Sequence, residues 1–306
     1  MLPDVPCFRL ASRSVLGEDL FSEGVSHASG VTAMYEKYWQ LSTKPFDGGG
    51  DARFYYPSEV HQGALLKLRY AIEARRGGAL LAGMSGSGKT MLVQSLERQL
   101  AENYAPFVHL VFPLLAPGEL VSLLAIELGA VTTAQQPSAE HCIRAVQTFL
   151  TENTRQGRHA VVAVDEAQLL ADTPAMETLR LLMNLNRGTD PVLTLLVVGQ
   201  SGLLPALDRM PAFEERLAVK CLLRPLTVDE TAAYVSHRLA AAGARHEIFT
   251  PDALTHLAHL ARGNPRRINR LCDLALLVGF AEEQKRIGPD QLDVIADELV
   301  HVSPDA

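Results

Sequence analysis

One stretch of eight residues combines glycines, a lysine and a threonine at a spacing that suits phosphate binding. It follows the apolar run 79–82 and precedes a helical pattern that starts at Lys89. Glycines allow a loop to wrap a phosphate chain and to aim backbone N–H groups at it, and the start of a helix favours an anion. The stretch fits G-x-x-x-x-G-K-S/T at every position and reads Gly83, Met84, Ser85, Gly86, Ser87, Gly88, Lys89, Thr90.

This pattern predicts a site for a nucleoside triphosphate. We expect Lys89 to reach the β- and γ-phosphates and the Thr90 hydroxyl to bind Mg²⁺. The alternative is a glycine-rich turn that binds nothing. The residues expected to contact the nucleotide are Gly83, Ser85, Gly86, Ser87, Gly88, Lys89, Thr90 and Met91.

Two acids form a second motif, because the apolar run 161–164 ends directly in Asp165 and Glu166. Ligands of parallel α/β sheets bind at the carboxyl ends of the strands, so we expect this pair beside the phosphate loop. Asp165 would hold Mg²⁺, directly or through water. Glu166 would orient and deprotonate an attacking water. The alternative is that both acids only cap a helix at 167–171.

The glutamate also separates classes of nucleotide-binding protein. Small GTP-binding proteins use a glutamine for this task, and we find no guanine-reading N-K-x-D motif at a strand end. Glu166 therefore favours a hydrolase of ATP that supplies its own base.

Composition narrows the class of protein further. The chain has 306 residues, 47% of them hydrophobic and 21% charged, which is enough for one large core and a smaller second one. The net charge of −7 gives no general attraction for nucleic acid or anionic lipid. The cysteines lie far apart, which predicts reduced and mostly buried thiols rather than a zinc site: Cys7, Cys142, Cys221 and Cys272.

No apolar run approaches the ~18–20 residues that a membrane span requires. The first thirty residues contain several acids and lack the apolar segment of a signal peptide. These features favour a cytoplasmic protein.

The rest of the chain alternates between short apolar runs and helical patterns, which predicts an α/β fold with a parallel sheet flanked by helices. After residue 224 the strands stop, and only helical patterns follow. Strands are expected at 79–82, 107–112, 160–164, 193–198 and 218–223. Helices are expected at 59–75, 89–103, 118–128, 139–156, 174–187 and 201–216, then at 228–242, 251–262, 265–283 and 289–299.

This order predicts three parts. Residues 1–33 are rich in Ser and Gly and would form a leader that is either disordered or an accessory arm. Residues 34–224 would form the nucleotide-binding α/β domain, with a turn-rich linker at 45–57. Residues 225–306 would form a small all-α lid domain.

Several motifs together resemble the AAA+ branch of the P-loop NTPases. They are Lys89-Thr90, the acidic stretch 164–168, Val198-Gly199-Gln200 and the basic stretch 263–269. The stretches 38–46 and 54–56, with His61, are further similar to the N-terminal signature of ExeA/GspA-type ATPases, which are related to the transposition ATPases TnsC and TniB. The resemblance spans about 34–300.

The resemblance implies roles for three further residues. Gln200 would be the sensor 1 residue, near the γ-phosphate and water. Arg216 would be an arginine finger that enters the site of a neighbouring subunit and stabilises transition-state charge, with Arg209 as the alternative. A surface arginine paired with Glu214 or Glu215 is the simpler interpretation of Arg216.

Arg266 would be the sensor 2 arginine that brings the helical lid onto the phosphates, and the adjacent Arg267 is the alternative. Together with Arg262 and Arg270 these arginines form a basic cluster, which could instead bind only solvent or acids. Phe46, Tyr55 and Tyr56 are candidates for an adenine pocket, although core packing is the simpler use of each aromatic ring. We expect His61 to be structural.

The resemblance also implies cofactors and partners: ATP with Mg²⁺, and a ring or helical homo-oligomer. The protein acted on would be a secretion component, or a transposase if the chain resembles the DNA-associated group more closely. A few local phosphate contacts suffice for DNA binding, so the net charge does not decide this alternative. A nucleotide-gated scaffold is the third possibility. ExeA itself continues into a membrane span, and since this chain ends at Ala306 we expect no direct membrane insertion.

Overall fold

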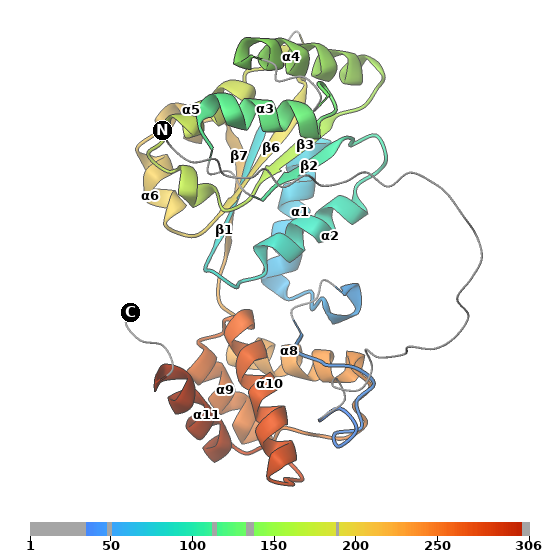
Figure 1. Ribbon diagram of the computed structural model, residues 1–306, viewed down its shortest axis with the longest axis vertical. Helices are drawn as coiled ribbons and strands as arrows, with labels where there is room; N and C mark the ends of the chain where they lie inside the picture. The colour runs from blue at the N-terminus through green and yellow to red at the C-terminus, as the bar shows by residue number, and fades with distance from the viewer. Residues whose placement is uncertain (1–34, 48–50, 112–114, 133–137, 188–189, 302–306) are drawn as a thin grey trace, which may run out of the picture. The chain divides into compact units, whose positions relative to one another are not determined.

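The computed structural model describes residues 35–47, 51–111, 115–132, 138–187 and 190–301 (Figure 1). The predicted leader, Cys7 and the glycines at 48–50 lie outside these ranges. Among the described residues a five-stranded sheet has the order β2-β3-β6-β1-β7, and every neighbouring pair is parallel. The strands are β1 (Gly78–Gly83), β2 (Phe107–Leu110), β3 (Ala160–Val164), β6 (Leu193–Gly199) and β7 (Leu217–Leu223).

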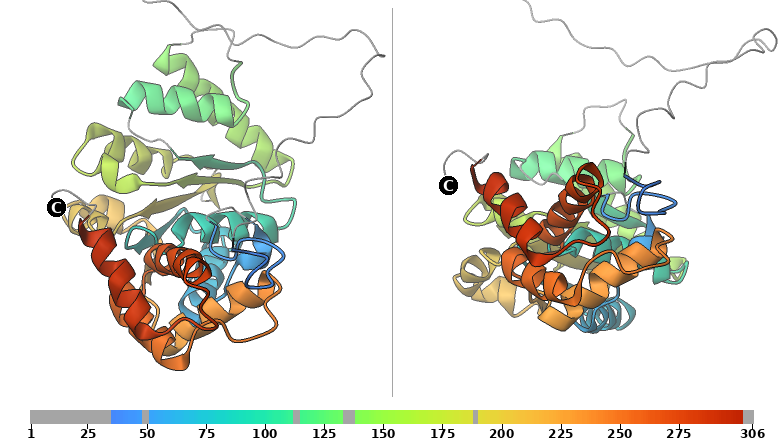
Figure 2. Two further views of the ribbon diagram at one scale, coloured as in Figure 1. Left: turned by 60° about the horizontal axis from the view of Figure 1, so that its bottom comes forward. Right: turned by 90° about the horizontal axis from the view of Figure 1, so that it is seen from below.

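Helices cover both faces of this sheet (Figures 1 and 2). Alternate strand residues point to opposite faces: Leu81 and Val161 pack with α1 (Glu59–Glu73) and α2 (Lys89–Gln99). Leu80 and Val162 pack on the other face. The helices of that second face are α3 (Pro117–Glu127), α4 (Ala139–Arg155), α5 (Pro174–Leu182), α6 (Leu203–Asp208) and α7 (Pro211–Glu214).

Two predicted helices differ from the structure. The single helix expected at 201–216 is two short helices. Met210, which precedes Pro211, has non-helical backbone angles (φ −122°, ψ 68°), and proline cannot donate a hydrogen bond inside a helix. The helix expected at 174–187 ends at Leu182. It is followed by a short antiparallel pair of β4 (Asn186–Arg187) and β5 (Asp190–Pro191), which the sequence analysis missed.

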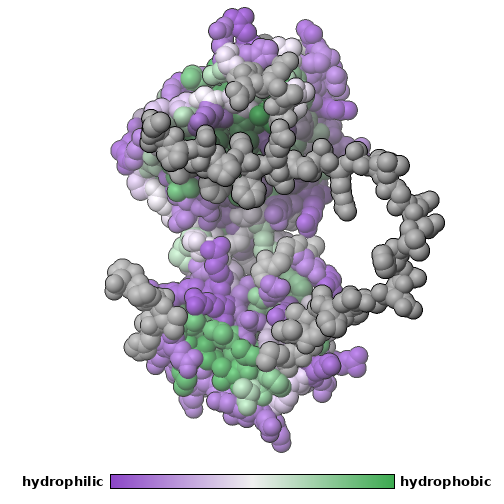
Figure 3. Space-filling model, viewed as in Figure 1, coloured by the Kyte–Doolittle hydropathy of each residue, from purple (hydrophilic) through white to green (hydrophobic). Residues whose placement is uncertain are grey.

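The helical region after β7 has the four helices that the sequence predicts. They are α8 (Val228–Ala241), α9 (Pro251–Ala261), α10 (Pro265–Ala281) and α11 (Pro289–His301). Three of them begin with proline, which suits the first helical position because no N–H is needed there. Apolar side chains also gather on the surface over α10 and α11 (Figure 3), where Leu277 and Val294 are exposed.

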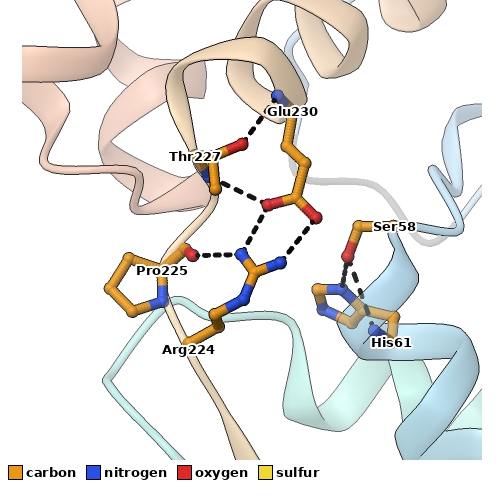
Figure 4. Close-up of polar contacts among 6 residues, drawn as sticks. All are labelled: Ser58, His61, Arg224, Pro225, Thr227 and Glu230. Atoms are coloured by element: carbon orange, nitrogen blue, oxygen red, sulfur yellow. Dashed lines mark hydrogen bonds and ion pairs between the residues drawn. The ribbon is translucent and has the colours of Figure 1, made fainter.

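A capping box joins β7 to this helical region (Figure 4). The Thr227 hydroxyl accepts the Glu230 N–H, and the Glu230 carboxylate accepts the Thr227 N–H. Arg224 donates to both oxygens of Glu230, at 2.6 and 3.1 Å, and to the Pro225 carbonyl. The start of α8 is therefore tied to the carboxyl end of the edge strand.

Residues 35–47 and 51–54 contribute side chains to the core of the helical region. Tyr35, Trp39 and Phe46 share one buried cluster with α8, α9, α10 and α11. The Trp39 ring is 1% exposed, and its Nε1 donates to the Leu276 carbonyl at 2.9 Å. The sequence analysis grouped this segment with the α/β part, and its side chains contribute to the other core.

No helix of the described residues is long and apolar enough to cross a membrane. Cys142, Cys221 and Cys272 are buried and free, as the sequence analysis expected, and the fourth cysteine, Cys7, lies outside the described residues.

Candidate functional site

The predicted phosphate loop lies between β1 and α2, and its backbone requires glycine. Gly86 and Gly88 have φ values of 77° and 90°, which other residues rarely adopt. A Cβ at Gly86 would lie 2.6 Å from the Arg266 Cβ, and a Cβ at Gly88 would lie 3.1 Å from the His61 Nε2. Side chains of other elements thus leave no room for a methyl group at Gly86, and at Gly88 the His61 ring would have to shift to admit one.

His61 holds this loop from α1. Its Nε2 lies 2.9 Å from the Ser87 carbonyl oxygen, and its Nδ1 lies 2.7 Å from the Ser58 hydroxyl (Figure 4). Because a carbonyl can only accept, Nε2 must carry the proton and the Ser58 hydroxyl donates to Nδ1. Burial lowers the pKa of His61 and favours this neutral form. His61 is therefore structural, as the sequence analysis expected.

Lys89 is a buried ammonium group held by main-chain oxygens. Its Nζ donates to the Gly83 and Met84 carbonyls, both at 3.0 Å. Burial lowers the pKa of Lys89, and the charges of Glu166 and Asp165 partly offset this shift. A buried cation held by carbonyls alone suits an incoming polyanion, so the residue type and place fit a phosphate ligand.

Thr90 and Asp165 meet at the carboxyl ends of β1 and β3. The Thr90 hydroxyl donates to Asp165 Oδ2 at 2.6 Å, and the Glu166 N–H donates to Asp165 Oδ1 at 2.8 Å. His109 Nε2 lies 3.5 Å from Oδ2. Burial would raise the pKa of Asp165, but these three neighbours lower it overall. A hydroxyl beside an ionised carboxylate is an oxygen donor set that fits Mg²⁺.

Glu166 occupies a left-handed backbone position, with φ 52°, at the start of the short helix η2 (Ala167–Leu170). Its side chain does not cap this helix, so the capping alternative fails for Glu166. Instead its Oε2 accepts from Gln168 Nε2 at 2.5 Å and from Gln200 Nε2 at 3.5 Å. The predicted base and the predicted sensor glutamine therefore lie side by side.

The N-terminus of α10 contacts the phosphate loop directly. Asn264 caps this helix by accepting the N–H groups of Arg266 and Arg267, and its Nδ2 donates to the Ser85 carbonyl at 2.7 Å. Arg266 Nη1 also lies 3.3 Å from the Ser85 hydroxyl. Arg266 is thus the arginine of this basic cluster that reaches the loop.

These elements enclose a cavity of about 240 Å³. The phosphate loop, Glu166 and the helical region all contribute to its wall, whereas neither Gln168 nor Gln200 does. It is lined by Asp47, Ser85, Gly86, Gly88, Lys89, Thr90, Met91, Glu166, Tyr234, Arg238, Pro265, Arg266 and Asn269. A larger hollow of about 550 Å³ lies along α8 and α9 and shares none of these catalytic candidates.

A smaller apolar hollow adjoins the cavity and shares four lining residues with it: Gly88, Met91, Tyr234 and Pro265. Tyr55 and Tyr56, two of the candidates for an adenine pocket, line this hollow. Phe46 is different, because its ring is 4% exposed within the core of the helical region and does not line either space.

Arg216 and Arg209 lie in different surroundings. Arg209 donates to both oxygens of Asp172, at 2.7 and 2.8 Å. Arg216 is exposed, and its side chain makes no hydrogen bond or ion pair with any residue that the structure describes. Glu214, one of the two partners that the simpler interpretation offered, pairs with Lys220 instead.

The sequence analysis missed two contacts that shape this site. It quoted the stretch 164–168 but assigned no role to Gln168. It also gave no role to Asn264, although an Asn-Pro pair at a helix start is a recognisable capping signal. One partner of each side chain lies on another element, Gln200 for Gln168 and Ser85 for Asn264, so these two contacts could not be read from spacing.

The fold and this geometry define a P-loop protein of the AAA type. Residues 72–207 match the family model described as an AAA domain, so the chain contains a domain of the AAA family and the predicted resemblance is confirmed. The chain is also 32% identical to general secretion pathway protein A of Aeromonas hydrophila over 269 residues. The match covers 87% of this chain but 48% of that protein, so the chain spans about half the length of this relative.

Solved structures support the same fold. The Aeropyrum pernix ORC2 protein, solved as ADPNP and ADP complexes, has a TM-score of 0.61 at 18% identity, over 83% of this chain and 71% of that one. Drosophila ORC bound to DNA has a TM-score of 0.63 at 16% identity, over 93% of this chain and 71% of that one. The α/β P-loop fold with a helical C-terminal region is confirmed.

Proposed function

We propose that this chain binds ATP in the cavity beside the phosphate loop and hydrolyses it. The observation that carries the proposal is the 2.6 Å contact between Thr90 and Asp165, next to Glu166 and in one cavity with Lys89. Lys89 and the loop amides would hold the phosphates, and Arg266 would approach them from α10. Thr90 and Asp165 would hold Mg²⁺, which supplies positive charge to the transferred phosphoryl group.

Glu166 is the proposed general base. Its carboxylate lines the cavity, and one of its oxygens, Oε1, accepts no hydrogen bond from the described residues. That oxygen is available to take a proton from water. Gln200 would act beside it as sensor 1, through its amide near Glu166 Oε2.

The substitution Glu166→Gln tests this assignment. We expect ATP binding to persist while turnover falls about 100-fold or more, because the amide cannot accept the proton. Turnover is measured by phosphate release, and binding by retention of labelled ATP. The exposed Glu97→Gln variant is the control and should keep wild-type turnover. Wild-type turnover in Glu166→Gln would remove Glu166 from the role of base.

The site would be completed by a second copy of this chain. Arg216 lies at the amino end of the sheet, where its carbonyl oxygen comes within 2.9 Å of the position of a Gly78 Cβ. The phosphate loop starts at the other end of β1, after Gly83. Five residues of strand span roughly 16 Å, which is longer than an arginine side chain. An Arg216 that acts on nucleotide must therefore act on that of a neighbour, within a ring or helical oligomer.

The partner would be a component of a secretion or envelope-assembly machine, and the name of the 32% identical relative, general secretion pathway protein A, favours the first of these two settings. A DNA-associated regulator, as in transposition, is the second candidate. It is favoured by the exposed Arg262, Arg267 and Arg270 around the start of α10 and by the DNA-bound ORC structure of similar fold. Stimulation of ATP turnover by duplex DNA, with a steep loss as salt rises, would support the second candidate. A rate of ATP turnover that DNA does not change at low salt would favour the first candidate, a secretion or envelope-assembly partner.

A further inference from the structure

We propose that Gln168 is a positioning residue. It is anchored by a hydrogen bond to Gln200, which follows β6, and it sets the orientation of the Glu166 carboxylate. This inference rests on the proposed ATP hydrolysis and assigns a function to a residue that lies outside the nucleotide cavity. Gln168 is the third residue after Asp165, within the short helix η2. The buried side chains of Ala167 and Leu170 on either side of it hold η2 against the sheet.

The amide of Gln168 bridges two elements. Its Oε1 accepts the Gln200 backbone N–H at 2.8 Å, and its Nε2 donates to Glu166 Oε2 at 2.5 Å. A backbone N–H can only donate, so the amide oxygen must face Gln200 and the NH₂ group must face Glu166. The orientation of this amide is therefore determined by its partners.

Glycine at position 199 is part of this arrangement. A Cβ on Gly199 would lie 3.0 Å from Gln168 Oε1 and 3.2 Å from the Gln168 backbone nitrogen. Such distances are tighter than ordinary van der Waals contact, so a larger residue would push Gln168 away from β6. The end of β6 and η2 can approach closely enough for the bridge because residue 199 has no side chain.

The consequence for Glu166 is that its two carboxylate oxygens differ. Oε2 accepts from Gln168 and, at 3.5 Å, from Gln200, whereas Oε1 is left for water. A carboxylate held by one oxygen cannot rotate freely, and a general base works only within hydrogen-bond reach of the proton that it takes. Because Gln168 does not line the cavity, it can affect the reaction only through the residues that it contacts, Glu166 and Gln200.

Two substitutions of Gln168 test this inference. Gln168→Ala removes both contacts, and we expect kcat to fall about tenfold while the KM for ATP changes less than about twofold. Gln168→Glu keeps the size and can still accept the Gln200 N–H, but it places a second carboxylate against Glu166. Its kcat should be low at pH 8 and recover towards pH 6, since two adjacent carboxyl groups then share a proton that restores the donor. Gln168→Ala should show no such recovery.

Gln156→Glu is the matched control. Gln156 also donates from its Nε2 to a glutamate, Glu152, but this pair is exposed on α4. We expect wild-type kcat and pH profile for it. Denaturant unfolding of all variants separates a positioning role from a structural one.

The outcomes are distinct. No ATP turnover by the wild-type protein, alone or with a partner, would reject the proposed function and this inference together. Turnover by the wild type with an unchanged kcat in Gln168→Glu at pH 8 would reject the positioning role alone. The positioning role would also be rejected if the loss of kcat in Gln168→Glu came with a rise in KM and a loss of stability and did not recover at low pH. Gln168 would then have a structural role only.

Discussion

At the scale of single residues, the site depends on groups that are placed where their chemistry costs free energy in the folded protein. Lys89 is an ammonium group that is 5% exposed, and Asp165 is a carboxylate that is 1% exposed. Burying charges is unfavourable unless partners or a ligand compensate for the lost hydration. Gly86 and Gly88 adopt positive φ values. These costs are expected at a binding site that is formed before its ligand arrives.

Gly86→Ala tests how closely the loop is fitted. The added methyl group would meet the Arg266 Cβ at 2.6 Å and the Asn264 Oδ1 at 2.9 Å, on a backbone with φ 77°. We expect ATP affinity to fall about tenfold or more, since the loop must move away from α10 or distort. Titration with a fluorescent ATP analogue measures the effect.

Gly63→Ala is the control, because it adds the same methyl group within α1 with nothing inside 4 Å. It should stabilise the protein by about 0.5–1 kcal/mol in denaturant unfolding and leave nucleotide affinity unchanged. Equal nucleotide affinity in Gly86→Ala and wild type would contradict the close fit of the loop.

At the scale of elements, the ends of helices and strands carry the function. The Ser58 cap of α1 orients His61 toward the loop, and the Asn264 cap of α10 orients that helix toward Ser85. A helix cap satisfies backbone N–H groups that have no partner within the helix. In this protein two such caps also fix the position of the phosphate loop.

Asn264→Ala separates the two tasks of a cap. Loss of the cap should lower the free energy of unfolding by about 1 kcal/mol. Loss of the bond to the Ser85 carbonyl should in addition weaken ATP binding. Thr250→Ala removes the cap of the neighbouring helix α9, where the hydroxyl accepts the Ala253 N–H and has no bond to the loop. Thr250→Ala should lower the free energy of unfolding by a similar amount and leave ATP affinity intact. Equal losses of ATP affinity in both variants would contradict a role of the Asn264–Ser85 bond in ATP binding.

The burial of His159, which directly precedes β3, leads us to expect that the free energy of unfolding depends on pH. Its ring is fully buried, Nε2 lies 2.8 Å from the Thr194 hydroxyl, and Nδ1 has no partner among the described residues. Burial, with the nearby Arg75 charge, lowers the pKa of His159 to about 4. The unfolded chain takes up this proton near pH 6.5, so acidification stabilises the unfolded state first.

We therefore expect stability to be full above pH 6.5 and to fall by up to about 3 kcal/mol as the pH drops towards 4. Urea unfolding across this range measures it. His159→Gln cannot take up the proton and should show a shallower fall, while His246→Gln, on an exposed loop, should follow the wild type. The same slope in His159→Gln would mean that other groups cause the acid sensitivity.

At the scale of the whole molecule, segments far apart in the sequence share one core. Trp39 packs under α10, and its ring contacts the position that a Gly279 Cβ would occupy at 2.9 Å. Arg238 on α8 is buried and donates to the Pro45 and Asp47 carbonyls and to the Tyr234 hydroxyl. The segment that leads into α1 is thereby fastened to the helical region that also lines the nucleotide cavity.

Arg216 provides the prediction at this scale. Arg216→Ala should bind ATP as the wild type does and lose most of its turnover, because the neighbour's site lacks the guanidinium. Mixing it with Lys89→Ala protein should restore turnover, since mixed assemblies contain sites with an intact phosphate loop that faces an intact Arg216. Arg209→Ala, which removes an exposed pair with Asp172 and a bond to the Pro205 carbonyl, is the control. A mixture with no recovered activity would reject action between copies.

The sequence by itself determined the features that depend on neighbouring residues. The phosphate loop, the acids at the end of the run 161–164, the alternation of strands and helices and the four C-terminal helices can all be predicted from spacing, because glycine, proline and apolar periodicity act over a few residues. Even there, Pro211 divided a predicted helix, since its effect on the backbone outweighs apolar spacing.

Only the tertiary structure decided which distant residues meet. Gln168 approaches Gln200 across 32 residues of sequence, Asn264 approaches Ser85 across 179, and Trp39 approaches Leu276 across 237. No local pattern encodes such pairs, because they arise when sheet order and core packing bring strand ends and helix starts together. Residue type alone predicts the chemistry of four side chains, and the fold brings them together: Lys89, Thr90, Asp165 and Glu166.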